Sequence, residues 1–320
     1  MELSQLGDTL VIANPTAHSG RGAASADFVE RFFSSYSSAA TRFEMYRTRT
    51  PLDATRKAAE GASFDTVIAL GGDGVIHEVV NGLMRIDEDR RPALAVIPMG
   101  SGNDFARTLG ATFNDPDRSL SEIVGGHGEL LDLGCVWADG GEPVYFAETL
   151  SFGLDAAIAL DTSDRRTRGT TQEGAGLFVT SGLRLLLRSR GGWSYRAVVD
   201  GEEMSGTSVI FAVQNGPTYG GGFRISPAAS PVDGLLDVCF STKAPSIPRS
   251  LALFGLARFG GHVGSRIMRS LTARRISVDF DADEVPCQVD GERLEGSSFE
   301  IEVVPAAIEV VVPERALFRA

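Results

Sequence analysis

Two apolar segments, each followed by a glycine-rich turn and a helix-like stretch, constrain the fold of this chain more than any other feature. The first lies in DTVIALGGDGVIHEVVNGL (65–83) and the second in LAVIPMGSGNDFARTLG (94–110). Their apolar cores, 66–70 and 93–97, contain no charged residue. Strands that are buried on both faces of a parallel sheet have this composition. The helix expected after each strand predicts a parallel sheet covered by helices.

The chain ahead of these segments continues the alternation of strand and helix. Residues 9–13 (TLVIA) stop at an Asn-Pro pair and predict a buried strand, and a helix is expected over 23–36. RFEMYRT (42–48) predicts a second strand, and Pro51 stands where the first residue of the next helix is expected. The N-terminal part is therefore predicted to be a doubly wound α/β domain.

Glycine-bearing loops follow three of the predicted strands: HSGRG (18–22), GGDG (71–74) and GSGND (100–104). Ligands of such sheets bind at the carboxyl ends of the strands. A glycine loop that leads into a helix lets the backbone approach a phosphate and presents N–H groups to it. Three such loops at one sheet edge predict a polyphosphate site, although each glycine is also compatible with a tight turn alone.

The acids in two of these loops, Asp73 and Asp104, predict phosphoryl transfer. A carboxylate beside phosphate is repulsive unless Mg²⁺ neutralises the charge or the carboxylate accepts a proton. The alternative is that both acids cap helices, which applies more readily to Asp104 because it follows Asn103, a good N-cap residue. No GxxxxGK[ST] loop occurs, and no GxGxxG follows the first strand, so a P-loop kinase and a Rossmann dehydrogenase are not expected.

Composition narrows the class of protein. The 320 residues carry a formal net charge of −12, which argues against nucleic-acid binding. Three widely spaced cysteines form neither a zinc pattern nor a disulfide framework. The N-terminus shows no signal-peptide pattern, and no run of about 20 apolar residues predicts a membrane span. We expect a cytoplasmic protein that is soluble or attached peripherally to a membrane.

From about residue 132 the pattern changes to short β segments separated by Gly, Pro and Asp turns, which predicts a β-sandwich with a helical insertion. One basic stretch within this half, 238–278, lacks Asp and Glu altogether. Its basic residues are Lys243, Arg249, Arg258, Arg266, Arg269, Arg274 and Arg275. Basic residues among Leu and Phe favour docking to anionic lipid headgroups. The alternative is a helix packed on the sandwich with its arginines reaching into water.

An ordered set of motifs resembles the catalytic domain shared by diacylglycerol, sphingosine and ceramide kinases. The motifs are NPTAHSGRG, GGDGVIHEVVNGL, PMGSGNDFAR, LDLG, FAETLSFGLDA, NGPTYGGGFRISPAASPVDGLLDV and QVDGERL. The resemblance implies an NAD kinase/diacylglycerol kinase-like α/β domain over 1–131 and a β-sandwich domain over 132–300. It also implies that a C-terminal segment, 301–320, returns to the first domain.

The resemblance implies roles for individual residues. The proton-accepting carboxylate would be Glu292 or Asp73, and Asp104 and Asp132 would belong to a water and Mg²⁺ network near the phosphates. The implied ATP contacts are Thr48, Gly71, Gly72, Asp73, Gly74, Val75, Ile76, His77, Gly100, Ser101, Gly102 and Asn103. The implied ligands of a further, structural metal are Ser230, Asp233 and the carbonyl of Leu235. Val75 stands where bacterial diacylglycerol kinases usually have threonine, which removes one hydroxyl contact to phosphate.

The function expected from these features is ATP- and Mg²⁺-dependent transfer of a phosphate to a lipid hydroxyl, in diacylglycerol or a related lipid alcohol. The alternatives are a sphingosine- or ceramide-type lipid kinase, an NAD kinase, and an inactive nucleotide- or lipid-binding regulator. The expected partners are the lipid substrate and a peripheral membrane surface, without nucleic acid. The sequence does not fix the acceptor lipid or the oligomeric state, a homodimer included.

Overall fold

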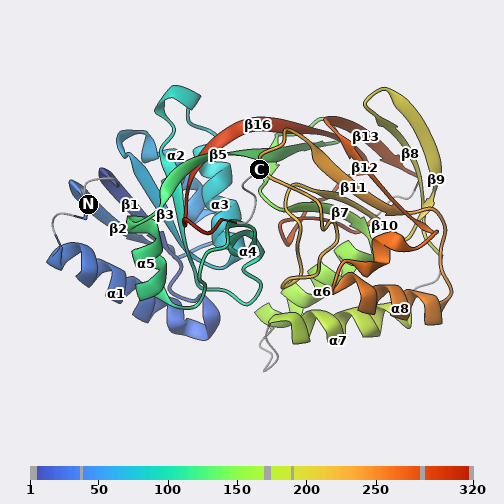
Figure 1. The fold of residues 1–320 in the computed structure, drawn as a ribbon, viewed down its shortest axis with the longest axis horizontal. Helices are drawn as coiled ribbons and strands as arrows, with labels where there is room; N and C mark the ends of the chain where they lie inside the picture. Colours follow the sequence, from blue (N-terminus) through green and yellow to red (C-terminus); the bar gives the residue numbers. More distant parts are fainter. Residues whose placement is uncertain (1–5, 37–38, 169–173, 189–190, 282–284, 317–320) are drawn as a thin grey trace. The chain divides into compact units, whose positions relative to one another are not determined.

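The computed structural model describes the chain apart from residues 1–5, 37–38, 169–173, 189–190, 282–284 and 317–320 (Figure 1). It divides into two compact units. The first comprises Met1–Leu131 with Ala306–Ala320, and the second is Asp132–Pro305. Two long strands, β5 (His127–Ala138) and β16 (Ser298–Val312), contribute residues to both units.

The first unit is built on a parallel sheet with the strand order β2-β1-β3-β4, and the end of β16 runs parallel to β4. The strands are β1 (Asp8–Ala13), β2 (Arg42–Arg47), β3 (Thr66–Gly71) and β4 (Ala93–Pro98). The helices are α1 (Arg21–Ser35), α2 (Asp53–Ala59), α3 (Asp73–Leu83), α4 (Asp104–Leu109) and α5 (Pro116–Val124). Short 3₁₀ helices occupy His18–Gly20, Gly61–Ser63 and Glu88–Arg90.

Helices cover both faces of this sheet (Figure 1). Val11 and Ile68 point to the face under α1 and α5, where they share a core with Val29 and Leu120. Because successive side chains of a strand alternate between faces, Leu10 lies on the opposite face, toward α2 and α3. Side chains on both faces are fully buried, which explains why β1, β3 and β4 are apolar throughout. The doubly wound α/β fold predicted from the sequence is therefore confirmed.

The start of α2 differs from the prediction. Pro51 precedes the helix instead of occupying its first position, because the chain turns at Leu52 in a left-handed conformation (φ 63°) and α2 begins at Asp53. The Asp53 carboxylate closes this turn by accepting hydrogen bonds from the backbone N–H groups of Arg49 (2.7 Å) and Thr50 (3.0 Å). These two bonds hold the pKa of Asp53 well below its usual range.

Within its described residues, the second unit contains two facing, mainly antiparallel sheets and three α-helices. One sheet has the order β16-β13-β8-β9, with β5 beside β16 and β6, and the other has the order β12-β11-β10-β7-β14-β15. The strands introduced here are β6 (Val144–Phe146), β7 (Thr149–Gly153), β8 (Trp193–Val199), β9 (Glu202–Ser208), β10 (Ile210–Gln214), β11 (Leu236–Ser241), β12 (Met268–Ala273), β13 (Arg275–Phe280), β14 (Cys287–Val289) and β15 (Glu292–Arg293). The helices are α6 (Leu154–Thr167), α7 (Gly174–Leu186) and α8 (Ile247–Ala257), and a 3₁₀ helix spans Gly261–Gly264.

The second sheet separates two apolar cores. Phe211 of β10 points into the sandwich, where Phe152 and Phe299 also lie, while its neighbour Ala212 points to the helices. The helix side holds a second core, to which α6, α7 and α8 contribute residues such as Ile158 and Phe178. This arrangement confirms the predicted β-sandwich with a helical insertion. Among the helices in the described part of the chain, none is long and apolar enough to cross a membrane.

Candidate functional site

The two glycine loops of the first unit lie against each other at the carboxyl ends of β3 and β4. A Cβ atom placed on Gly100 would come within 2.7 Å of the Gly72 Cα atom, so only glycine fits this contact. The Met99 N–H also donates to the Gly71 carbonyl oxygen (2.7 Å) and continues the strand pairing into the loops. The structure thus brings together two of the loops that the sequence predicted to bind phosphate.

Asp73 holds the two loops together. Its carboxylate accepts hydrogen bonds from the backbone N–H groups of Asn103 (2.8 Å) and Asp104 (3.0 Å), which start α4. Hydrogen bonds to a charged acceptor contribute about 1.5–3 kcal/mol each. Asp73 therefore caps a helix, although it caps α4 across the sheet edge and not its own helix, α3. Asn103 occupies the N-cap position of α4 in a left-handed conformation (φ 53°) but makes no side-chain cap. Its amide group donates instead to the Gly100 carbonyl oxygen (2.7 Å).

The remaining predicted ATP contacts differ in how far they can reach a ligand. The side chains of Val75 and Ile76 are buried, and their N–H groups donate to the Gly72 carbonyl oxygen at the start of α3. These two residues therefore support the loop from behind. His77 and Ser101 are half-buried. Thr48 follows β2 and donates its N–H to the Ala13 carbonyl oxygen (2.9 Å), which fixes it at the same edge of the sheet.

The carboxylates of Asp73 and Asp104 flank Gly102. A Cβ atom on Gly102 would lie 2.5 Å from Asp73 Oδ2 and 3.3 Å from Asp104 Oδ2. Carboxylate oxygens close to bound phosphates are the ligands that Mg²⁺ prefers, so the donor set fits this ion. Asp132, the other residue predicted for the Mg²⁺ network, belongs to the second unit.

Glu292 stands on a hairpin of the second unit that Asp290 fixes in place. Asp290 (φ 48°) and Gly291 (φ 91°) form the turn between β14 and β15, as predicted for an Asp-Gly pair. The Asp290 carboxylate accepts three backbone hydrogen bonds, from Ala147 (2.8 Å), Glu148 (3.1 Å) and Thr149 (2.9 Å). The turn is thereby bound to the start of β7, and Glu292 follows it with its side chain exposed.

Asn215 joins further motifs in the second unit. Its buried amide group donates to the carbonyl oxygens of Asp132 and Ala147, both at 2.9 Å. Asp132 is also buried, and its carboxylate accepts the Gly234 N–H (2.7 Å) while its own N–H donates to the Pro231 carbonyl oxygen (2.7 Å). The segments LDLG, FAET, NGP and PVDG are therefore packed around one buried amide group.

The loop predicted to hold a structural metal lies beside Asp132. Burial raises the pKa of Asp233, and the nearby Asp132 charge raises it further, against a hydrogen bond from the Leu235 N–H. Burial, followed by the Asp233 charge, raises the pKa of Asp237 to about 6. A cation would relieve this repulsion, so the acids fit the predicted site. Within the described residues, no group of three or more His, Cys, Asp or Glu side chains is placed to hold a metal, and the assignment of Ser230, Asp233 and Leu235 stays a prediction.

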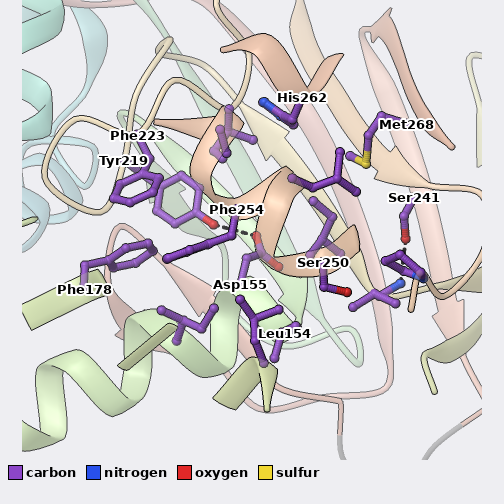
Figure 2. Close-up of a pocket in the computed structure, with 18 residues that line it drawn as sticks. Leu154, Asp155, Phe178, Tyr219, Phe223, Ser241, Ser250, Phe254, His262 and Met268 are labelled. Carbon is purple, nitrogen blue, oxygen red and sulfur yellow. Dashed lines mark hydrogen bonds between the residues drawn. The ribbon is translucent and has the colours of Figure 1, made fainter. Parts of the chain in front are cut away.

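Sequence reasoning did not identify an apolar cavity on the helix side of the second sheet. Its walls are formed by side chains of α6, α7, α8 and neighbouring strands, among them Phe178, Phe223 and Phe254 (Figure 2). The buried carboxyl group of Asp155 also lines it. The available signal was an acid inside SFGLDAAIAL, a segment that is otherwise apolar or small.

Comparisons with known proteins decide the family. A model of the diacylglycerol kinase catalytic domain matches residues 8–136, and a model of the YegS C-terminal NAD kinase beta sandwich-like domain matches 148–312. The diacylglycerol kinase of Mycobacterium tuberculosis is 31% identical over 257 residues, which cover 80% of this chain and 79% of that protein. This chain belongs to the diacylglycerol kinase catalytic domain family.

Other relatives of this lipid kinase agree in sequence and fold. A probable YegS-like lipid kinase of Yersinia enterocolitica is 30% identical over 264 residues, or 82% of this chain and 84% of that protein. A crystal structure of a putative diacylglycerol kinase from Bacillus anthracis has a TM-score of 0.79 at 23% identity, covering 98% of this chain and all of that one. An NAD kinase from Archaeoglobus fulgidus in complex with ATP shares the fold at a TM-score of 0.55 and 15% identity, covering 97% of this chain and 96% of that one. The predicted lipid-kinase class and two-part fold are therefore confirmed.

Proposed function

We propose that this lipid kinase transfers the γ-phosphate of ATP to the free hydroxyl group of diacylglycerol or a closely related lipid alcohol. The observation that carries this proposal is the apolar cavity of the second unit. Its lining is almost entirely apolar and includes no Lys or Arg among the described residues. Such a cavity suits a hydrocarbon chain and offers nothing to the charged pyrophosphate of NAD⁺.

ATP binding is assigned to the glycine loops that Asp73 joins. Gly72 and Gly100 have no side chains to cover the backbone where the loops meet, so phosphate oxygens can approach main-chain N–H groups. Thr48, Ser101 and the start of α3 lie around this edge. Bound with the nucleotide and held by Asp104, Mg²⁺ would neutralise phosphate charge during transfer.

We assign proton acceptance to Glu292 and a positioning role to Asp73. Both oxygens of Asp73 already accept backbone hydrogen bonds, whereas Glu292 is exposed on a hairpin that Asp290 holds rigidly. In the reaction, the oxygen of the lipid hydroxyl group bonds to the γ-phosphorus, and Glu292 accepts the proton of that hydroxyl group. The bond from the γ-phosphorus to the bridging oxygen breaks, and ADP leaves with that oxygen.

A membrane-docking surface is assigned to α7, α8 and the segment after α8. Exposed apolar side chains gather there, with Phe259 the most exposed at 81%. The others are Val179, Leu183, Leu187, Ile247, Leu256 and Val263. Arg188, just after α7, and Arg249 and Arg266 are also exposed. Apolar side chains flanked by cations match the headgroup region of an anionic bilayer, and the kinase would collect its lipid there.

The proposal is tested by transfer of label from γ-labelled ATP in the presence of Mg²⁺. Mixed micelles present diacylglycerol, sphingosine, ceramide and a monoalkylglycerol in separate reactions, and NAD⁺ is the acceptor in a parallel reaction. The wild type is compared with Glu292→Gln and Asp73→Asn. We expect label in phosphatidic acid, a loss of turnover in Glu292→Gln with unchanged nucleotide affinity, and weaker nucleotide binding in Asp73→Asn. Label on NAD⁺, or ATP binding without transfer to any acceptor, would refute the proposal.

A further inference from the structure

The cavity in the second unit has a carboxyl group in its wall that the proposed reaction does not use. Its volume is about 90 Å³, and its apolar lining suits a segment of lipid chain. Asp155 is the only acid among the described lining residues, and its side chain is 6% exposed. Figure 2 shows its carboxyl group among the lining side chains, linked to the hydroxyl group of Tyr219.

The two oxygens of Asp155 have different surroundings. Oδ2 accepts a hydrogen bond from the Tyr219 hydroxyl group (2.9 Å). The Ser151 hydroxyl group and the backbone N–H groups of Asp155 and Ala156 also lie near the carboxyl group, but buried Oδ1 has no well-formed hydrogen bond among the described residues. Leaving such an oxygen unpaired in an apolar environment costs about 1–3 kcal/mol. Because this oxygen belongs to a residue that lines the cavity, a ligand there can supply the hydrogen-bond partner that Oδ1 lacks.

Among the described residues, no charged group stabilises the ionised form of Asp155. The titratable side chains near it are Tyr219, Cys239, Cys287 and His262. Burial raises the pKa of both thiols and lowers that of His262, so the thiols and the imidazole stay neutral. The nearby cations of α6 and α7 are engaged elsewhere. Arg184 pairs with Asp161 (3.3 Å), and Arg165 donates to the hydroxyl groups of Thr180 and Ser181. Burial raises the pKa of Asp155 to about 7, against hydrogen bonds from Tyr219, from Ser151 and from nearby backbone N–H groups.

A neutral Asp155 is a hydrogen-bond donor to the cavity. Because Oδ2 accepts from Tyr219, the proton of the neutral acid resides on Oδ1. A carboxylic acid kept neutral in an apolar site can donate to a carbonyl oxygen. An ester-linked acyl chain carries such an acceptor at its head, whereas an ether-linked alkyl chain of the same length has no carbonyl.

We propose that protonated Asp155 donates a hydrogen bond from Oδ1 to the carbonyl oxygen of an ester-linked acyl chain in this cavity. Asp155 thereby makes the kinase select acyl lipids over alkyl lipids. This inference rests on the proposed function for its substrate class, but it concerns binding and can be measured without turnover. A lipid with an amine in place of the ester would instead favour ionised Asp155 and bind more tightly as the pH rises.

The test compares two probes of equal chain length, dioctanoylglycerol (ester) and dioctylglycerol (ether). Binding is followed by the fluorescence of Trp193, whose ring lies against Gly153 beside Asp155, in a Trp137→Phe background. Asp155→Leu removes the donor, and Asp155→Asn keeps an N–H donor that does not titrate. Ser250→Ala removes a hydroxyl group from the same cavity and serves as the matched control.

For the wild type we expect the ester to bind about tenfold more tightly than the ether, a difference of about 1.4 kcal/mol. The preference should vanish in Asp155→Leu and persist in Asp155→Asn and Ser250→Ala. Ester affinity should fall as the pH rises from 6 to 8 in the wild type and stay flat in Asp155→Asn. If Asp155→Leu does not fold, comparing the pH profiles of ester binding in the wild type and in Asp155→Asn still tests the inference.

Equal binding of ester and ether by the wild type, an unchanged preference in Asp155→Leu, or a flat wild-type pH profile would overturn the inference. So would tighter binding of sphingosine than of the ester at high pH. Turnover is measured on the same samples. Phosphorylation of both glycerol probes with equal kcat/KM would refute the role of Asp155 and leave the proposed function intact. Selective ester binding without phosphorylation of any lipid would refute the proposed function and leave the role of Asp155 intact.

Discussion

Replacing Asp290 tests how the second unit positions its candidate base. In Asp290→Ala, three backbone hydrogen bonds to Ala147, Glu148 and Thr149 are lost together. Each bond to a carboxylate contributes about 1.5–3 kcal/mol, but the side chain is half-buried and water can replace part of this. Alanine must also adopt the left-handed conformation of residue 290 (φ 48°), which costs about 1–2 kcal/mol. We expect the free energy of unfolding to fall by about 3–4 kcal/mol.

The companion variant Asp290→Asn separates these effects. Asparagine tolerates the left-handed conformation and keeps one oxygen that accepts a backbone hydrogen bond, so we expect a loss of about 1–2 kcal/mol. Both tryptophans, Trp137 and Trp193, belong to the second unit, so urea unfolding followed by fluorescence reports on this unit. With a slope of about 2 kcal/mol/M, the midpoint should fall by about 1.5–2 M in the alanine variant and by about 0.5–1 M in the asparagine variant. Equal shifts in the two variants, or an unchanged midpoint in Asp290→Ala, would contradict the reasoning.

Three further variants probe the loops, the buried acid and the docking surface. In Gly102→Ala the new Cβ would lie 2.5 Å from Asp73 Oδ2, so the two glycine loops should separate. The KM for nucleotide should rise at least tenfold, and the free energy of unfolding should fall by about 1–3 kcal/mol. A KM equal to that of the wild type would refute this reasoning. The folded-state pKa of Asp155, about 7, exceeds its ordinary value of 3.8. Its contribution to stability is therefore full below pH 4 and falls by on the order of 4 kcal/mol as the pH rises to about 7. The urea midpoint should decline across this window more steeply in the wild type than in Asp155→Asn, and parallel profiles would refute the assignment. Charge reversal of the exposed residues Arg249 and Arg266 to Glu should abolish sedimentation with anionic vesicles and leave activity on detergent micelles unchanged. Unchanged sedimentation would refute the docking surface.

Local patterns in the sequence were enough to predict the architecture. The strands β1, β3 and β4 are apolar on both faces because helices cover both sides of their sheet. The Asp-Gly pairs at 200–201 and 290–291 adopt positive φ angles and join antiparallel strands, as the pair predicts. Each of these features depends on residues that are close together in the chain.

Features that depend on distant residues were not predicted. The role of Asp73 requires hydrogen bonds to residues 30 and 31 positions further along. The turn before α2 is local, but it depends on the Asp53 side chain, which the proline pattern does not take into account. The burial of Asp155 was not predicted, because an acid at the start of a helix is commonly found at the protein surface. Only its burial beside Tyr219 distinguishes it.

The central claim, ATP-dependent phosphorylation of a lipid hydroxyl, is tested most directly by a competition in one tube. The purified kinase is incubated with ATP, Mg²⁺, NAD⁺ and mixed micelles of diacylglycerol, and the products are identified by mass spectrometry. We predict phosphatidic acid and ADP in equal amounts, with no phosphorylated NAD⁺. Phosphorylated NAD⁺ as the main product, or ADP formed without any phosphorylated lipid, would contradict the account.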